Sequence, residues 1–407
     1  MRVVIAGGGL AGLAAAAALG GSGFDVELHE ARPFLGGRAA SFPLAPGDPH
    51  SETIDNCQHV LLRCCRNLLD FYRRCGVLDK IRFYDQYHFV EPGGRVSWLE
   101  PAALAFLGFP ALGWRDKLSV ARGLYRMKRE ARSDRLTFSS WLEAHRQSDG
   151  AVRRFWRPIV VSALNEEPER AAAGAAFQVF LEGFLASRDG YQMGVPAVPL
   201  SELYSPAALP RVTIRLRSPL ERLDAVPADF YVSAVPLERV NELIPGLDLD
   251  LSRFEHSPIT GIHLWLDREI TALPQAALLD RTIQWMFRKS ARHYHLVVSA
   301  SRSLLPLGRQ EIIDLAIREL GEFFPVAREA RLERGHVIKE PRATYSPAPG
   351  VEASRPGAAT KFPNLFLAGD WTQSGWPATM EGAVRSGYLA AEAICRAAGR
   401  PARFLIS

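Results

Sequence analysis

The chain has 407 residues, a formal net charge of +5 and five cysteines, and 47% of its residues are hydrophobic. It is long enough to bury two large cores, and its charge is too small for this length to indicate nucleic-acid binding. The odd cysteine count, without a CxxC pair or histidines at zinc-ligand spacing, argues against a disulfide scaffold and against a metal site. No run of residues looks like a membrane span, and an odd cysteine count in a chain without a secretion signal predicts reduced thiols and a cytoplasmic protein.

The chain begins with the pattern of a dinucleotide-binding unit. Arg2–Ala6 is an apolar run rich in β-branched residues, and glycines in the spacing GxGxxG follow it directly. An Ala/Leu-rich segment after the glycines predicts a helix, and a second predicted strand, Val26–His29, ends at Glu30. Strand, glycine turn, helix, strand and acid stand in the order that a dinucleotide-binding βαβ unit requires.

The residue types of this unit each have a chemical reason. Gly7 permits a tight turn, Gly9 lets the backbone approach a pyrophosphate, and Gly12 lets the helix pack closely on the strand. The helix N-terminus adds free N–H groups and a positive dipole end for the phosphates. Glu30 stands near the spacing expected for a carboxylate that binds a ribose hydroxyl.

A second glycine pair follows the acid closely. Gly36-Gly37 predicts another close approach of the backbone to the cofactor, and Arg38 is available for its phosphates. The cofactor would therefore meet the chain twice within its first forty residues or so.

A run of small and polar residues, Thr53–His59, comes next. Its Asp55 or Asn56 is expected to cap the helix that follows, which ends at Gly76. The alternative is that this run lines an active site next to the cofactor.

The middle of the chain predicts a basic helix and an antiparallel sheet. A helical pattern starts at Trp114, and a helix with so many basic residues either is a solvated face or lies on an anionic membrane surface. Three apolar runs, at 261–266, 284–289 and 293–301, predict strands of an antiparallel sheet that would form the floor of a substrate cavity. The basic residues of the helical segment are Arg115, Lys117, Arg122, Arg126, Lys128, Arg129 and Arg132.

The C-terminal part predicts a further contact with the cofactor. Asn364–Ala368 is typical of a buried strand, and Gly369-Asp370 follows it. Thr379 can cap the next predicted helix, which begins with Met380 and Glu381 and whose N-terminus is another anion-binding site. A dinucleotide that is held from both ends of the sequence favours FAD over NAD.

These motifs resemble those of the flavin amine oxidase and phytoene desaturase superfamily, with GxGxxG, Glu30 and GGR at the start and LFLAGDWT and SGWPATMEGAVRSG at the end. The resemblance implies an α/β fold, in which a Rossmann-like FAD-binding domain is joined to a discontinuous substrate domain of antiparallel sheet plus helices. It implies an FAD-binding domain at residues 1–80, 200–240 and 340–407, and a substrate-binding domain at residues 81–199 and 241–339.

The resemblance also implies roles for the cofactor-binding residues. Glu30 holds the adenosine ribose, Arg38 reaches the phosphate and flavin region, and Asp370 binds the pyrophosphate–ribityl segment. A plain turn acid is the alternative for Asp370. Met380 and Glu381 lie where a helix N-terminus meets the pyrimidine edge of the flavin. The complete predicted set is Gly7, Gly9, Ala11, Gly12, Glu30, Ala31, Gly36, Gly37, Arg38, Gly369, Asp370, Met380 and Glu381.

A narrower resemblance rests on the segment DNCQHVLLRCCRNLL, from Asp55 to Leu69. It is similar to the DNGQHVLLG-type segment of the hydroxysqualene dehydroxylases, although Cys57 stands where a glycine is usual. The resemblance extends over nearly the whole chain. Further matches are FWRP at 155–158, SALN at 162–165, GVP at 194–196, PLSEL at 199–203 and ATY at 343–345.

This narrower resemblance implies reductive dehydroxylation of hydroxysqualene to squalene in squalene and hopanoid biosynthesis. Loss of the hydroxyl needs a proton donor, reduced FAD supplies a hydride, and an apolar pocket excludes water. His59 is the candidate acid, with Gln58 and Asp55 as alternatives. The implied partners are hydroxysqualene and an electron donor for the flavin. Because such a substrate is insoluble in water, we also expect peripheral association with the inner membrane.

Three alternatives stand beside this interpretation. A carotenoid desaturase also ends in a MEGA-type helix. A flavin amine oxidase would carry an aromatic pair beside the flavin, and only Trp376 stands in that neighbourhood of the sequence. A non-catalytic isoprenoid carrier of the same architecture needs no flavin, so the complete set of cofactor motifs argues for an enzyme.

Overall fold

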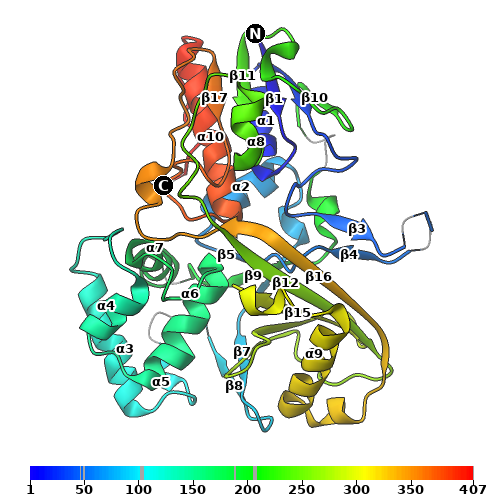
Figure 1. The fold of residues 1–407 in the computed structure, drawn as a ribbon, viewed down its shortest axis with the longest axis vertical. Helices are drawn as coiled ribbons and strands as arrows, with labels where there is room; N and C mark the ends of the chain where they lie inside the picture. Colours follow the sequence, from blue (N-terminus) through cyan, green and yellow to red (C-terminus); the bar gives the residue numbers. More distant parts are fainter. Residues whose placement is uncertain (46, 49–50, 101–104, 188, 205–208, 407) are drawn as a thin grey trace.

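A computed structural model of the protein describes residues 1–45, 47–48, 51–100, 105–187, 189–204 and 209–406. Two large sheets organise the molecule (Figure 1). A five-stranded sheet lies at one end, and a seven-stranded sheet lies at the other end beside a group of helices.

The first sheet contains β1 (Arg2–Ala6), β2 (Asp25–His29), β10 (Val212–Arg215), β11 (Phe230–Ser233) and β17 (Leu365–Leu367). It is parallel throughout, in the order β10-β2-β1-β11-β17. Helix α1 (Leu10–Gly21) connects β1 to β2, so the predicted βαβ unit and the α/β class are confirmed. The strands come from segments assigned above to the FAD-binding domain, and the domain boundaries themselves stay a prediction.

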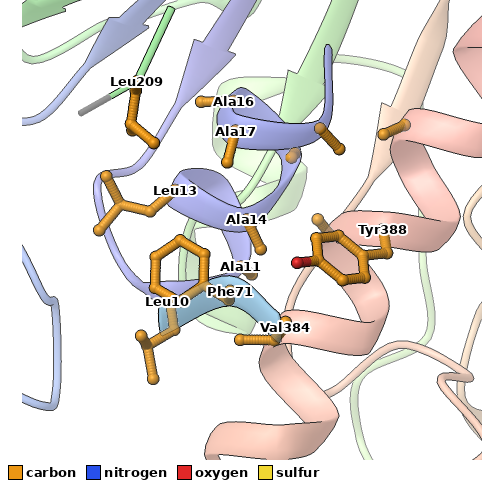
Figure 2. Packing of buried hydrophobic residues seen from close by; sticks show 14 of the residues in the cluster. Leu10, Ala11, Leu13, Ala14, Ala16, Ala17, Phe71, Leu209, Val384 and Tyr388 are labelled. Atoms are coloured by element: carbon orange, nitrogen blue, oxygen red, sulfur yellow. The ribbon is translucent and has the colours of Figure 1, made fainter. Parts of the chain in front are cut away.

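Helix α10 (Met380–Ala397) crosses α1 at very short range (Figure 2). A Cβ atom on Gly387 would lie 2.2 Å from the carbonyl oxygen of Ala11 and 2.9 Å from the amide nitrogen of Ala15, so this position requires glycine. The ring of Tyr388 packs beside the crossing (Figure 2). The alanine run of α1 therefore serves close packing on several sides rather than one amphipathic face.

The second sheet contains β7 (Tyr87–Val90), β8 (Val96–Leu99), β12 (His256–Leu266), β13 (Gln275–Leu278), β14 (Trp285–Arg288), β15 (His293–Ser299) and β16 (Leu332–Tyr345). Its order is β16-β12-β15-β14-β13-β7-β8, with β13–β7 parallel and the other pairs antiparallel. The predicted antiparallel pairing of the runs at 261–266, 284–289 and 293–301 is confirmed.

The two faces of this second sheet have different neighbours. Alternate residues such as Ile262 and Leu296 pack with α9 (Arg309–Phe323) in an apolar core. The residues between them point to the opposite face because side chains alternate along a strand. On that face His263 contacts the carbonyl of Asp55, so this face, called here the inner face, is turned toward the N-terminal part of the chain.

The helical part is tied to the second sheet through Asn165. This residue has a φ of 53°, and its side-chain amide donates to the carbonyl of Ser257 at 2.9 Å and to Thr344 Oγ1 at 3.0 Å. Its side-chain oxygen accepts from the amide of Ala300 at 2.7 Å. The helices of this part are α3 (Trp114–Met127), α4 (Phe138–Ala144), α5 (Asp149–Ala151), α6 (Arg157–Leu164) and α7 (Ala173–Gln178), with π-helical turns at Val152–Trp156 and Val179–Leu185.

Short strands lie between the two large sheets (Figure 1). Strands β3 and β4 pair with each other, and β9 pairs with both β5 and β6. The bounds of these smaller elements are β3 (Ser41–Pro43), β4 (Thr53–Asp55), β5 (Leu61–Leu62), α2 (Arg66–Arg74), β6 (Ile81–Tyr84), β9 (Met193–Pro196) and α8 (Leu237–Leu243).

The predicted capping of a helix by Asp55 or Asn56 is wrong. Asp55 ends strand β4, and helix α2 begins only at Arg66. The N-terminus of α2 is capped from the other end of the chain, since the carboxylate of Glu381 accepts from the amides of Asn67 at 3.2 Å and Leu68 at 2.7 Å. A distant carboxylate thus takes the place of the local cap.

We expect Gly387→Ala to destabilise the protein by about 1–3 kcal/mol, because the added methyl group clashes with the backbone of α1. Gly21→Ala is the matched control. A Cβ atom at Gly21 meets nothing within 4 Å, so this variant should be neutral or slightly stabilising. Thermal unfolding of both variants measures the difference, and equal melting temperatures would contradict the tight crossing.

Candidate active site

The glycine turn after β1 has the geometry that its sequence predicts. Gly7 has a φ of +108°, and a Cβ there would lie 2.5 Å from the carbonyl oxygen of Ala234. A Cβ on Gly12 would lie 1.9 Å from the carbonyl oxygen of Gly7. At Gly9 a Cβ would meet just one atom within 4 Å, the Cα of Gly37 at 3.9 Å, so the backbone is open to a bound group there.

The buried carboxylate of Glu30 faces this turn. One of its oxygens accepts from the amide of Gly8 at 2.7 Å and the other from the amide of Arg32 at 2.8 Å. The N-cap of α1 is Gly9, which has no side-chain cap, so the first amides of α1, including that of Ala11, have no partner within the helix. Ala31 is exposed beside Glu30.

The second glycine pair lies directly against the first motif. Gly36 forms a parallel bridge with Gly9, and its amide donates to the carbonyl of Gly8 at 2.9 Å. The guanidinium of Arg38 pairs with the carboxylate of Asp370, which joins the first motif to the last. Asp370 is therefore more than a turn acid, since it links two segments that the sequence separates widely.

The loop after β17 is held by Arg355, a residue that the sequence did not indicate. Its buried guanidinium donates to the carbonyls of Asp370 at 3.0 Å and Trp376 at 2.8 Å, to that of Thr372, and to Ser374 Oγ at 3.2 Å. It stands in a loop of the sequence with no periodic or motif signal. Arg355 therefore fixes the loop that carries Gly369 and Asp370.

The N-terminus of α10 presents backbone groups and not the carboxylate of Glu381. Thr379 Oγ1 accepts from the amide of Gly382 at 3.3 Å, while the amides of Met380 and Glu381 have no partner within the helix. The Glu381 side chain is turned to α2, as described above, and burial raises its pKa. Any contact of Glu381 with the cofactor would come from its backbone.

These residues fit a dinucleotide such as FAD. The open backbone at Gly9, the uncapped N-terminus of α1 and the buried Glu30 carboxylate match the pyrophosphate and ribose of such a group. The N-terminus of α10 adds a second set of amides for an anionic or carbonyl-rich part of the cofactor.

The predicted acid candidates lie next to a lysine that the sequence did not indicate. The buried carboxylate of Asp55 accepts from Ser41 Oγ at 2.7 Å. The ammonium of Lys289 lies 3.5 Å from Asp55 Oδ2 and 3.3 Å from Gln58 Oε1. Lys289 follows β14 and reaches this place only through the pairing of the second sheet. Buried Asp55 and Gln58 and the partly exposed Lys289, whose side chain is 27% exposed, form one polar group.

His59 presents an acceptor in its neutral form. Its Nδ1 lies 3.0 Å from the carbonyl oxygen of Cys57, and because a carbonyl only accepts, we assign the proton to Nδ1. The Nε2 atom of a neutral ring is then an acceptor. Burial lowers the pKa of His59, so the protonated form that could act as an acid is a minor one at neutral pH.

Three histidines gather on the inner face of the second sheet. His263 and His295 are opposite each other in the β12–β15 register, and their stacked rings have centroids 3.8 Å apart. His263 Nδ1 lies 3.0 Å from His293 Nε2, and His263 Nε2 lies 3.2 Å from the carbonyl oxygen of Asp55. Burial lowers the pKa of His263 and of His293 to about 3. The signal missed in the sequence was the alternation of His293 and His295 in one strand.

An apolar cluster adjoins the histidines. Its buried members are Cys57, Met193, Val195, Phe287 and Val297. They come from the segment after β4, from β9 and from the inner face of β14 and β15. The arrangement therefore offers apolar surface directly beside the polar group of Asp55, Gln58 and Lys289.

Fold and site together define a flavin-dependent oxidoreductase. The family described as flavin containing amine oxidoreductase matches residues 10–395, and the chain belongs to this family. The predicted superfamily and the FAD cofactor are thereby confirmed.

Two curated relatives match almost the full length of the chain. A hydroxysqualene dehydroxylase of Sinorhizobium fredii is 29% identical, over 96% of this chain and 97% of that protein. A zeta-carotene desaturase of Synechocystis is 26% identical, over 97% of both. Among solved structures, cyclohexylamine oxidase of Brevibacterium oxydans shares the fold, with a TM-score of 0.69 and 18% identity over 98% of this chain and 99% of that one.

The lowered histidine pKa values predict that stability falls with acid. Below pH 6.5 an unfolded histidine binds a proton that folded His263 does not, so folding free energy is lost as the pH falls from 6.5 toward the folded pKa of about 3. His263→Gln should reduce this slope by about 1.4 kcal/mol per pH unit. Denaturant unfolding of the FAD-loaded protein at several pH values measures the slope, with His145→Gln as the control for loss of an imidazole. An unchanged slope in His263→Gln would count against a neutral buried ring.

Proposed function

We propose that the protein catalyses the FAD-dependent reductive dehydroxylation of an isoprenoid alcohol, hydroxysqualene, to squalene. The observation that carries this proposal is the contact of Lys289 with buried Asp55 and Gln58 beside an apolar cluster. A hydroxyl group on a long hydrocarbon needs both a proton source and an apolar surface. The similarity to hydroxysqualene dehydroxylases supports the choice of substrate.

The chemistry divides between cofactor and protein. Reduced FAD supplies a hydride when it is bound. Departure of the hydroxyl as water takes up one proton, and the ammonium of Lys289 carries three donors for this purpose. Asp55 and Gln58 accept from Lys289 and so orient it, whereas burial disfavours the protonated form of His59, the candidate acid predicted from the sequence. The apolar cluster excludes water that would otherwise capture the carbocation.

A carotenoid desaturase is the first alternative, since zeta-carotene and phytoene desaturases are also similar to this chain. A desaturase removes hydride from a hydrocarbon that carries no hydroxyl. It has no leaving group to protonate, so the lysine beside the apolar cluster would have no chemical task.

A flavin amine oxidase is the second alternative. The guanidinium of Arg385 lies over the ring of Trp376, 5.4 Å from its centroid, which places a positive charge on the aromatic ring that an amine would use. Lys289 adds a second positive charge near the predicted active-site segment. Both charges disfavour a cationic substrate.

We further propose that the protein docks on an anionic membrane through a surface formed by β8, residues 105–108 and α3, which lie at the same end of the molecule (Figure 1). Large apolar side chains and basic side chains alternate on this surface, as in interfacial helices. In the described part of the chain no helix has the length and hydrophobicity to span a bilayer. The exposed apolar residues are Trp98, Leu107, Trp114, Leu118 and Tyr125.

The reaction is tested with the reduced enzyme under anaerobic conditions. Addition of hydroxysqualene should yield squalene and oxidised flavin in equal amounts, measured by gas chromatography and flavin absorbance. Lys289→Met should lower the rate of squalene formation by about a hundredfold or more, because it removes the proton donor and keeps the length of the side chain.

Lys361→Met is the matched control, since Lys361 is exposed and lies in a loop before β17. Its rate and its FAD content should equal those of the unchanged protein. Bound FAD without squalene, together with desaturation of a carotenoid by the oxidised enzyme, would replace this proposal with the desaturase.

Membrane docking is tested by flotation with vesicles that contain an anionic lipid. Replacing Trp114 and Leu118 by glutamate removes apolar contacts and opposes the surface charge, so the bound fraction should fall several-fold. Leu216→Glu, at an exposed apolar residue that directly follows β10 of the first sheet, should float like the unchanged protein. Equal flotation of all three proteins would contradict the proposal that this surface docks on the membrane.

A further inference from the structure

His295 is a buried side chain with unused hydrogen-bonding capacity. Its ring has no solvent exposure, and in the described part of the chain neither ring nitrogen has a hydrogen-bond partner. Buried polar atoms are nearly always paired, because an unpaired one loses its hydration without replacement. Two such atoms on one ring point to a partner that binds there.

The ring is held in a fixed place on the inner face of the second sheet. It stacks on His263 at an angle of 19° between the rings. The ring packs closely on the backbone of residue 261, since a Cβ atom there would lie 3.0 Å from His295 Nε2. The same Cβ atom would lie 3.4 Å from the carbonyl oxygen of Asn56, so the segment that precedes His59 covers this side of the ring.

The protonation state of the ring defines which group it can bind. Burial lowers the pKa of His295, and the neighbouring His263 ring and Lys289 ammonium lower it further, so the ring is neutral at neutral pH. A neutral imidazole has one donor and one acceptor. A hydroxyl group matches both, whereas an ammonium group only donates and a hydrocarbon does neither.

Apolar side chains continue from the ring along the same face. Val297 lies two residues further on β15, and Phe287 is opposite His295 in the β14–β15 register. Trp285 is opposite Val297 in that register and packs against the apolar cluster described above, to which Phe287 and Val297 belong. A ligand with an apolar chain and one hydroxyl would match this sequence of surfaces.

We propose that His295 recognises the hydroxyl group of a long-chain isoprenoid alcohol and selects it over the corresponding hydrocarbon. The inference deepens the proposed function and rests on it for the identity of the alcohol. The alcohol lies with its chain against Trp285, Phe287 and Val297 and reaches the ring when the segment around Asn56 moves aside. His295 is thus a specificity-determining residue.

The test measures binding to the FAD-loaded, oxidised protein, in which no reductive turnover takes place. Farnesol and its hydrocarbon counterpart farnesene are the probes, and tryptophan fluorescence is the readout because Trp285 lies in the cluster. Farnesol should bind about tenfold or more tightly than farnesene. His295→Leu should weaken farnesol binding alone and so abolish this preference. His145→Leu is the matched control, because His145 stands at the C-terminal end of helix α4, and it should keep the preference.

A second measurement uses the unchanged protein and so does not depend on a variant that folds. Nitrogen NMR of labelled histidines should show the His295 ring signals shift with farnesol and stay in place with farnesene. Absence of that shift, or a His295→Leu protein that still prefers farnesol, would overturn the inference. If the reduced enzyme leaves hydroxysqualene unchanged while the alcohol preference still depends on His295, the proposed reaction fails and the recognition site stands. If squalene forms but no preference for the alcohol depends on His295, the recognition site fails and the proposed reaction stands.

Discussion

The close crossing of α1 and α10 is the contact on which the rest of the structure depends. Gly387 brings the last long helix against the backbone of Ala11, so the two ends of the sequence meet at the glycine turn. The loop that leads into α10 then lies within reach of the first motifs, and the Arg38–Asp370 pair joins them. A dinucleotide can therefore be held by amides from two helix N-termini, of which one begins near residue 10 and the other near residue 380.

Buried charges in this molecule are compensated across long sequence separations. The carboxylate of Glu381 caps α2, the guanidinium of Arg355 serves four groups of one loop, and Asp55 is held by Ser41 and Lys289. Each of these groups would be costly to bury alone, and each is stabilised by partners from a different segment. Of these contacts, the pair of Lys289 and Asp55 joins the second sheet to the N-terminal part of the chain, so paired charges as well as apolar packing define the site there.

The region between the sheets changes from polar to apolar over a few residues. Lys289, Asp55 and Gln58 stand on one side, the three histidines of β12 and β15 stand next to them, and the cluster around Phe287 follows. A hydrocarbon without a polar group would leave the polar side unused, and a cationic substrate would meet a positive lysine. An apolar molecule with a single hydroxyl uses both sides, which is the physical basis of the proposed reaction.

The sequence by itself determined the nucleotide-binding half of this protein, because its signals are local. Turn geometry within a few residues explains the spacing of Gly7, Gly9 and Gly12 and the acid at Glu30. Side-chain alternation within a few residues likewise explains the strand pattern of the middle segment, which forms the second sheet. The tertiary structure alone decided which side chains meet in the site. Glu381, and not Asp55 or Asn56, caps α2, and this cap comes from 313 residues away. Lys289 reaches Asp55 across 234 residues, and His295 meets His263 through sheet register. No local pattern encodes such contacts, because they depend on how the sheets pair and pack over the whole chain.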